Sequence, residues 1–423
     1  MANDFVKKIY RNNKKDGSTA FPTSVEAGSL SSNNPWVSGR VVNWGSVRGT
    51  ANSPVDRATR SSDIYVEVGQ DIQTAIDVQA ARSGGKVLLK NGIHKPKKNI
   101  YLYGGVLIEG ESYNAIVDFE SQAFGFIAQG TNSYTTGTIS VNLGGTTVTG
   151  AGTAWTDDMI GRDILLKGVW YPIVARTNGT ELTIAYPFVD TNVAGIEYAI
   201  ADVMRNAYIY TLTIRNSFSY AIYIAYCSDF YVQNVIVETC AYCLYDSFSY
   251  NSQYEALDAL YCAYGQYFYN SNYFFHSLCG ATGTTIGNGI NMENCSYFNL
   301  FTDFILASSN DGGIKAVNCD TGTYKACVSN NNLFNGISLF SNNRNIVIEG
   351  TSTVSNGANG IYLGANNDYN IISNNLCRDN GDYGIDISAA TCDGNLIGAN
   401  IYNNNVTGDY DDNGTNTKIV TVV

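Results

Sequence analysis

Acidic side chains in the second half of the chain are the first candidates for catalysis. Glu255 and Asp303 follow Ala241 and Gly289 by 14 positions each, and these two small residues belong to a repeat. Strands stacked ~4.8 Å apart would separate the two carboxylates by ~9.6 Å if both pointed outward. Glycoside hydrolysis needs two carboxylates about 5–9.5 Å apart, so Glu255, Asp303 and the nearby Glu293 are candidate catalytic residues. They form no known catalytic signature.

A polysaccharide lyase would need other groups. β-Elimination uses a base such as Lys or Arg, and often a calcium ion held by clustered acids. Residues 216–314 contain neither Lys nor Arg, which argues against a lyase site in the middle of the chain. The sequence leaves catalysis open: an enzyme of this composition would be a glycoside hydrolase or a polysaccharide lyase.

A second group of residues has the composition of a carbohydrate-binding surface. Tyr267, Tyr269, Asn291, Glu293 and Lys315 occupy outward positions of successive repeats, so stacked strands would bring them onto one patch. Aromatic faces beside an amide, a carboxylate and an amine are groups that bind sugars. The alternative is a solvated sheet face with ordinary aromatic and Glu–Lys pairs between strands.

Tyrosine is concentrated in the same part of the chain. Of the 31 tyrosines, 15 lie between Tyr208 and Tyr273. An aromatic surface of this density is not expected to be simply solvated. It indicates either a track for carbohydrate or an interface between subunits.

These residues must be positioned by a repeat of about two dozen residues. A small residue followed by a large one recurs at intervals of 20 to 24 residues. A period of this length is the signature of a solenoid, and the alternating apolar and polar residues after each marker indicate strands with one buried face. The small residues are Ala221, Ala241, Gly265, Gly289, Gly313, Gly336, Gly360 and Gly384.

The repeat assigns strand residues to columns. Gln266 interrupts the inward column and would need a hydrogen-bond partner if it is buried. Because the repeats contain no amphipathic helix of ten residues, they predict an all-β fold, a parallel β-helix with ~24 residues per coil. The predicted inward column is Ile222, Tyr242, Gln266, Ile290, Ile314, Ile337, Ile361 and Ile385, and the outward column begins Tyr223, Cys243, Tyr267, Asn291 and Lys315.

The chain divides into four predicted segments. Residues 1–64 are polar and basic and form an N-terminal attachment segment, and residues 65–130 hold a short capping helix at 71–81 and the first coils. Residues 131–200 lose the repeat and predict a small inserted β domain, whose Trp155 and Trp170 either fill its core or stack on sugars. Residues 201–423 form the main parallel β-helix.

Charge and composition exclude several functions. Residues 1–100 hold 15 Lys/Arg and 8 Asp/Glu, whereas the remainder holds 10 and 29, so the acidic body is not expected to bind nucleic acid. No run of ~18 apolar residues predicts a membrane span, and the N-terminus lacks the apolar region of a classical signal peptide. Two histidines and ten scattered cysteines predict no metal site or cofactor, and the cysteines are expected to be buried thiols.

Several stretches resemble the right-handed parallel β-helices of the pectate-lyase-like superfamily. Residues 72–77 (IQTAID), 84–89 (GGKVLL), 91–93 (NGI) and 105–110 (GVLIEG) are similar to the first coils of such proteins. Residues 411–417 (DDNGTNT) are similar to their ends. The resemblance implies a right-handed parallel β-helix, and insertions like residues 131–200 are familiar in phage tailspike and tail-fibre proteins.

The resemblance to tailspike and tail-fibre proteins implies a function. It implies a virion protein, commonly a homotrimer, that binds and in some cases degrades host surface polysaccharide. Residues 1–64 would then join it to other virion or tail proteins, and the protein would act on the virion or otherwise at an extracellular surface. Two alternatives stay open: a non-catalytic structural or adhesive β-helix of a capsid or cell surface, and a free-standing polysaccharide hydrolase or lyase.

Overall fold

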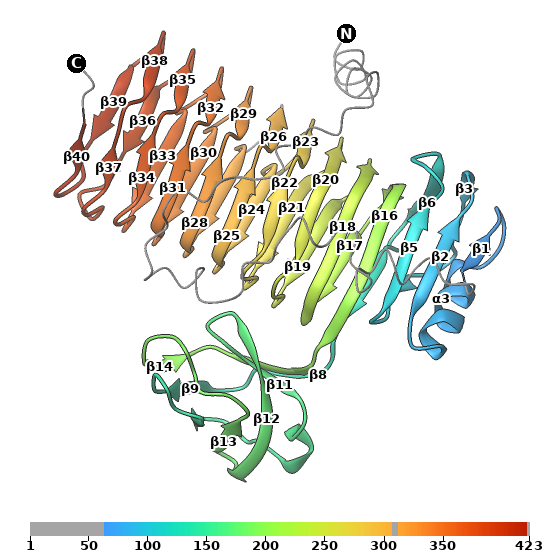
Figure 1. The fold of residues 1–423 in the computed structure, drawn as a ribbon. Coiled ribbons are helices and arrows are strands. Elements are labelled where there is room, and N and C mark those ends of the chain that lie inside the picture. The colour runs from blue at the N-terminus through green and yellow to red at the C-terminus, as the bar shows by residue number, and fades with distance from the viewer. Residues whose placement is uncertain (1–62, 307–311, 421–423) are drawn as a thin grey trace, which may run out of the picture. The chain divides into compact units, whose positions relative to one another are not determined.

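The computed structural model describes residues 63–306 and 312–420. The predicted attachment segment, apart from its last two residues, lies outside the described residues. In the described part, strands from successive coils pair in parallel to form two long sheets (Figure 1). This is the predicted parallel β-helix.

One face of the coils is an 11-stranded parallel sheet. Each coil after the insertion contributes one strand to this sheet, and its outward side carries the predicted binding residues. Its strands are β4 (Ile100–Tyr101), β7 (Phe126–Gln129), β17 (Tyr220–Ala225), β19 (Tyr242–Ser247), β21 (Tyr264–Tyr269), β24 (Ile290–Glu293), β27 (Ile314–Val317), β30 (Ile337–Ser341), β33 (Ile361–Ala365), β36 (Tyr383–Ile387) and β39 (Gly408–Asp412).

The other faces belong to a 21-stranded sheet. Most later coils contribute two short strands to it, with a bend between them. Its strands are β1 (Ile64–Val66), β2 (Gly85–Leu89), β3 (Gly92–His94), β5 (Val106–Gly110), β6 (Ala115–Gln122), β16 (Met204–Ser217), β18 (Cys227–Glu238), β20 (Gln253–Leu260), β22 (Phe275–Ser277), β23 (Gly280–Thr282), β25 (Ser296–Phe301), β26 (Phe304–Leu306), β28 (Asp320–Lys325), β29 (Val328–Asn330), β31 (Arg344–Glu349), β32 (Ser352–Val354), β34 (Ile371–Ser373), β35 (Leu376–Arg378), β37 (Leu396–Ile397), β38 (Ile401–Asn403) and β40 (Lys418–Ile419).

The isoleucine column is confirmed. Ile314, Ile337, Ile361 and Ile385 are paired directly from strand to strand, and each is fully buried. These four coils thus place the same apolar residue on one interior line, and burial of a side chain of this size contributes about 1.5–3 kcal/mol. This stacking fixes which residues face outward on the same strands.

The predicted register is wrong for the coil of β19. Tyr242 pairs with Tyr220 and Tyr264, whereas Leu244 continues the inward column between Ile222 and Gln266. The reason is that these coils advance by 22 residues instead of 24. The marker of this coil, Ala241, therefore lies two residues before the position that the strand register requires. In the outward column, Tyr245 takes the position that was predicted for Cys243.

Asparagine side chains stabilise the bends between strands. Asn342 donates to Asn318, and Asn366 donates to Asn342, at bends where the backbone has positive φ. A second ladder is buried: Asn332, Asn356 and Asn380 are linked from coil to coil through their amides. Asparagine tolerates the left-handed backbone and carries both a donor and an acceptor, so it satisfies a repeated bend.

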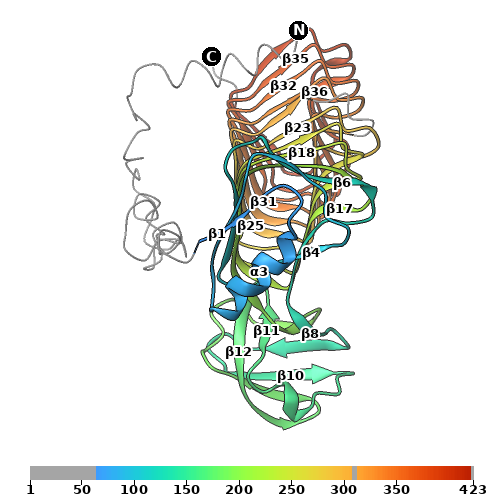
Figure 2. The same cartoon turned by 90° about the vertical axis from the view of Figure 1, so that its right-hand side faces the viewer.

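The first end of the β-helix is covered by α3 (Ile72–Ala81), as Figure 2 shows. Asp71 caps this helix by accepting a hydrogen bond from the Gln73 N–H, and Ile72, Ala75 and Ile76 pack into the core of the β-helix. The helix therefore shields the apolar interior where no further coil covers it. No helix in the described residues is long and apolar enough to span a membrane.

Between β7 and β16 the chain forms a separate eight-stranded sheet. Trp155 lies in the core of this insertion, and Trp170 packs with Phe248 and Tyr250 of the β-helix, so both tryptophans are buried and do not form a sugar-stacking surface. The elements are β8 (Thr131–Tyr134), β9 (Thr138–Val141), β10 (Thr147–Ala151), the 3-10 helix η1 (Asp157–Met159), β11 (Asp163–Leu166), β12 (Val169–Asn178), β13 (Glu181–Ile184), β14 (Val193–Ile196) and β15 (Ala199–Asp202).

Candidate functional site

A ladder of tyrosines lies on the outward side of the 11-stranded sheet. Tyr223, Tyr245 and Tyr267 occupy the same position of β17, β19 and β21. Their ring centroids are 5.6 and 5.2 Å apart, and their ring planes differ by only 4° and 5°. Parallel pairing in register produces this stack, because it brings identical side chains to the same height on neighbouring strands.

A second ladder runs beside the first one. Tyr220, Tyr242 and Tyr264 begin the same three strands, with centroid distances of 4.9 and 4.4 Å. Tyr220 also contacts Tyr245, at 5.0 Å, so the two ladders form one continuous aromatic surface. All six side chains are partly buried. We call these six residues the tyrosine surface.

The five predicted binding residues continue this surface. Tyr267, Asn291 and Lys315 are paired in sequence across β21, β24 and β27, and Tyr269 pairs with Glu293. The structure therefore brings all five onto one patch. Lys315 places its ammonium group 4.8 Å from the centre of the Phe340 ring.

The first ladder ends at Tyr267. On one side its ring stacks on Tyr245, but on the other side the next coil has Asn291, whose side chain is much smaller than a phenol ring. The Asn291 amide is 3.4 Å from the Glu293 carboxylate. A ring face next to an amide and a carboxylate is therefore positioned only at this step of the ladder.

Burial affects the hydroxyl groups of this surface. It raises the pKa of Tyr245 to about 12. Burial and a hydrogen bond to Glu293 raise the pKa of Tyr267 further. Both phenols are therefore neutral at physiological pH and can donate hydrogen bonds. Because the rings stack on one another, solvent meets ring edges and a row of hydroxyls rather than a row of ring faces.

The predicted catalytic pair is not formed. Glu255 pairs with Ser277, which pairs with Phe301, so Glu255 and Asp303 do not share a column. Asp303 is fully buried, whereas Glu255 lies at the surface and accepts a hydrogen bond from Gln233 at 2.7 Å. Because Asp303 points into the core, it cannot serve as the outward carboxylate that the prediction required.

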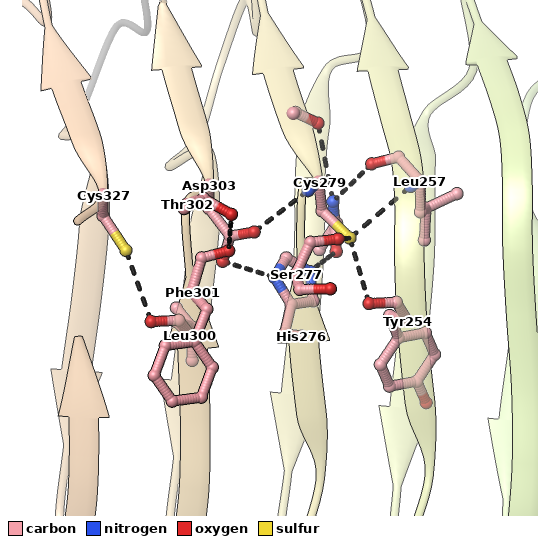
Figure 3. A network of polar contacts seen from close by, with 12 residues as sticks. Tyr254, Leu257, His276, Ser277, Cys279, Leu300, Phe301, Thr302, Asp303 and Cys327 are labelled. Atoms are coloured by element: carbon pink, nitrogen blue, oxygen red, sulfur yellow. Dashed lines mark hydrogen bonds and ion pairs between the residues drawn. The ribbon is translucent and has the colours of Figure 1, made fainter. Parts of the chain in front are cut away.

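Asp303 belongs to a polar network inside the middle coils (Figure 3). Its carboxylate lies 2.7 Å from Nδ1 of His276 and accepts a hydrogen bond from the Cys279 N–H at 2.9 Å. The other ring nitrogen of His276 contacts Oε1 of Gln266, and the Gln266 amide donates to the Leu257 carbonyl at 3.2 Å. Gln266 thus has the partners that its burial was expected to require.

The same network contains metal-binding side-chain types. Ligand atoms of His276, Cys279 and Asp303 lie within 4.8 Å of one another. Each already has a hydrogen-bond partner within the protein, because the Cys279 thiol lies 3.3 Å from the Ser277 carbonyl oxygen. The three groups are therefore hydrogen-bonded within the protein as parts of a buried structural network.

A groove lies where the insertion packs against the β-helix. Its volume is about 200 Å³. Tyr297 and Phe248 supply aromatic groups, and Asn270, Asn272 and Asn294 supply amides. Its charged lining residues are Lys167, Asp190, Glu197 and Asp320. No local motif indicates this groove, because residues more than a hundred positions apart form it.

Sequence reasoning also missed most of the tyrosine surface. Tyr220, Tyr242 and Tyr264 recur every 22 residues, as do Tyr223, Tyr245 and Tyr267. This spacing is visible in the sequence, but it differs from the spacing of the later repeats. An alignment of these three coils on the 22-residue spacing predicts both ladders.

No protein-family model and no curated protein matches the chain. Solved structures with similar folds include the mannuronan C-5 epimerase AlgE6 A-module of Azotobacter vinelandii, at 11% identity and a TM-score of 0.48, covering 87% of this chain and 99% of that one. Another is the Gp54 tailspike of Acinetobacter baumannii bacteriophage AP22 in complex with capsular saccharide. It is 11% identical with a TM-score of 0.40, and the match covers 83% of this chain and 66% of that one. A third is a mutant of the tailspike protein of E. coli bacteriophage HK620 in complex with a pentasaccharide. It is 11% identical with a TM-score of 0.44, and the match covers 81% of this chain and 57% of that one. Because these identities and TM-scores are low, the assignment of the fold rests on the strand pairing described above.

Proposed function

We propose that this protein binds polysaccharide at the end of the tyrosine surface. The observation that carries the proposal is the step from Tyr267 to Asn291, where the ladder of rings ends and an amide takes the place of the next ring. Sugars bind to aromatic rings through their apolar faces and to amides and carboxylates through their hydroxyls. Tyr267, Asn291 and Glu293 present these three groups together.

The rest of the surface supports binding of a chain instead of a single sugar. The ladders extend over three coils, and they repeat a phenol hydroxyl at a spacing set by the strands. Lys315 adds one positive charge on the opposite side of Asn291. A polysaccharide running along the β-helix axis would contact the hydroxyl row and the last ring of the ladder together.

We propose further that the polysaccharide is a host surface glycan and that the protein is a tailspike or tail-fibre component of a virion. The basic residues 1–64 would join it to other tail proteins, and it would act as a homotrimer. This assignment is supported by the resemblance of the first coils to the pectate-lyase-like superfamily and by the presence of an insertion in the β-helix. A free-standing hydrolase or lyase is the enzymatic alternative, with the groove carboxylates Asp190, Glu197 and Asp320 as its new candidates.

Binding is tested by titrating capsule or lipopolysaccharide fragments into the protein and into Tyr267→Ala. We expect Tyr267→Ala to weaken binding about tenfold or more, which corresponds to about 1.4 kcal/mol or more. Tyr186→Ala is the matched control, because Tyr186 is 65% exposed on the insertion. Equal affinities of all three proteins for a bound glycan would contradict the proposed site.

Catalysis is tested in the same mixtures by measuring new reducing ends and unsaturated products. Reducing ends alone would indicate a hydrolase, and unsaturated products a lyase. Persistent binding without either product would reject the enzymatic alternative and leave a binding protein.

One observation favours a second function for the tyrosine surface. Its six rings form a continuous aromatic patch, which is also suited to an interface between subunits. Sedimentation of the protein and of Tyr245→Asp distinguishes the two functions. Dissociation of an oligomer by Tyr245→Asp would assign the surface to assembly, whereas an unchanged oligomeric state with lost glycan binding would assign it to carbohydrate.

A further inference from the structure

The groove between the insertion and the β-helix is lined by hydrogen-bonding groups that the protein itself does not use. On the β-helix side its wall includes Phe248, Asn270 and Asn294, which occupy the same bend position of three successive coils. On the side of the insertion lie the turn at Lys167 and Gly168, between β11 and β12, and residues 196–198 at the end of β14. Two distant parts of the chain therefore supply the two walls.

A ladder of asparagines ends at this groove. In the later coils Asn366 donates to Asn342, Asn342 donates to Asn318, and Asn318 donates to Asn294 at 3.1 Å. No bond continues the ladder from the amide NH₂ of Asn294 to the side chain of Asn270 among the described residues, and the Asn270 amide has no other side-chain partner there. Both amides line the groove and so offer it donors and acceptors.

Asn272 adds a largely buried polar group to the same wall. The residue is 6% exposed, and Gly168 packs so closely on it that a Cβ at Gly168 would come within 2.3 Å of its side chain. The Asn272 NH₂ donates to the Asn270 carbonyl at 3.0 Å, whereas its own carbonyl oxygen has no partner among the described residues. The small exposed part of Asn272 therefore leaves an acceptor beside the groove.

The charged side chains of the groove disfavour an acidic ligand. Lys167 lies 3.5 Å from Asp190, so these two charges compensate each other. Glu197 of the insertion and Asp320 of the β-helix have no Lys or Arg partner among the described residues, which leaves two negative charges. Both are exposed, so solvent weakens their repulsion of an anion without removing it. Among the described residues, these carboxylates do not converge within 4.8 Å as the ligands of a metal ion would.

Aromatic rings border these polar groups. Tyr297 stacks on Tyr273 with ring centroids 4.5 Å apart, and Phe248 meets Tyr269 edge to face at 5.7 Å. Tyr297 and Phe248 both line the groove, whose volume is about 200 Å³. Pockets for drug-sized ligands measure about 300–1,000 Å³, so this groove is suited to one sugar residue at a time.

We propose that the groove binds one uncharged sugar residue, whose hydroxyls donate to the groove carboxylates and accept from the amides of Asn270 and Asn294. A lining of amides and carboxylates needs a ligand that both donates and accepts, as sugar hydroxyls do, and aromatic rings pack on the apolar face of a sugar. The groove goes beyond the site proposed at Tyr267 and does not depend on it, because no residue of the tyrosine surface lines it.

Side-chain amides report on this groove directly. In protein labelled with ¹⁵N-asparagine, the NH₂ signals of Asn294 and Asn342 are those missing from Asn294→Gly and Asn342→Gly, which keep the bends because glycine tolerates their positive φ. Glucose, galactose and mannose, each compared with its own uronate, are titrated into the full chain. We expect at least one neutral sugar to shift the Asn294 signal saturably. Asn342, at the same bend two coils further on and outside the groove, should not respond.

The uronate of that sugar should bind about threefold or more weakly, because two exposed carboxylates repel it. Ser296→Leu fills the groove and should weaken binding about tenfold or more. Ser352→Leu, at the start of β32 and outside the groove, is the matched control and should bind normally. Circular dichroism checks that both leucine variants fold.

Four results would each overturn the proposal. They are no saturable shift at Asn294 with any of the three neutral sugars, an equal shift at Asn342, a uronate that binds as tightly as its neutral sugar, and unchanged binding in folded Ser296→Leu. The first three are measured on the natural protein and therefore decide the proposal even if Ser296→Leu does not fold.

Discussion

Replacing Asp303 tests whether the buried network holds the middle coils together. The carboxylate accepts from the Cys279 N–H and pairs with His276, and all of these groups lie in the core. In Asp303→Ala both groups lose their partner, in a place that water does not reach. Orphaned buried groups are destabilising by about 1–3 kcal/mol each, and breaking a buried pair by about 3–5 kcal/mol. We therefore expect the free energy of unfolding to fall by about 3–5 kcal/mol.

Asp303→Asn is the control that keeps the shape. Its amide oxygen can accept from the Cys279 N–H, and its amide NH₂ can donate to Nδ1 of His276. The ring then carries its proton on Nε2, which faces Oε1 of Gln266. Because every hydrogen bond has a replacement, we expect a loss below about 1.5 kcal/mol.

The assay is urea unfolding at pH 7, followed by far-UV circular dichroism. If refolding is incomplete, unfolding rates in the same urea concentrations give the comparison. The reasoning would be refuted if Asp303→Ala were within 1 kcal/mol of the natural protein, or if the Asn variant lost as much stability as the Ala variant.

Two further predictions concern other buried polar groups. Burial raises the pKa of Asp246 to about 6, so the folded protein keeps a proton that the unfolded chain releases near pH 4; the resulting stability is present at low pH and is lost as pH rises through 6. A rise of the pKa from about 4 to about 6 corresponds to about 3 kcal/mol. The free energy of unfolding of Asp246→Asn should therefore increase relative to that of the natural protein as pH rises from 4 to 7. A difference between the two proteins that stays constant over this pH range, measured by urea unfolding, would contradict the argument. The side chain of Asn356 forms four buried hydrogen bonds, to Asn332, Ser329 and Asn380, and Asn356→Ala should therefore lower the free energy of unfolding by about 2–5 kcal/mol. Asn342→Gly, at an exposed bend with a φ of +54° that glycine tolerates, should lose less than about 1 kcal/mol, and equal losses in the two variants would show that the buried ladder has no special role.

The β-helix could be predicted because its later coils have a nearly constant length. From Ile290 to Ile385 the marker residues and the strand register agree, so a count along the chain gives the interior line. The same count fails between Ile222 and Gln266, where the coils are two residues shorter. A solenoid tolerates this difference because the bends absorb it while the strands stay paired. The sequence does not indicate which bend is shortened.

The burial of Asp303 could not be predicted from its own sequence neighbourhood. A carboxylate is rarely buried unless it is paired, so an outward position was the reasonable expectation. Its partner His276 lies 27 positions earlier, in the preceding coil, and His276 in turn contacts Gln266 of its own coil, so only the stacking of two coils completes the network.

The interior network and the outer tyrosine surface occupy the same coils, and this coincidence has a physical consequence. Gln266 and Tyr267 are neighbours on β21, so one points into the core while the other points outward. Gln266 is fixed by bonds to Leu257, Gly280 and His276, which lie on different strands. A slip of β21 by one residue would bury Tyr267 and break all of these bonds at once. An apolar residue at position 266 would tolerate small shifts along the strand, whereas the amide does not. The buried polar network therefore fixes the register that places the ring of Tyr267 at the end of its ladder, beside Asn291 and Glu293.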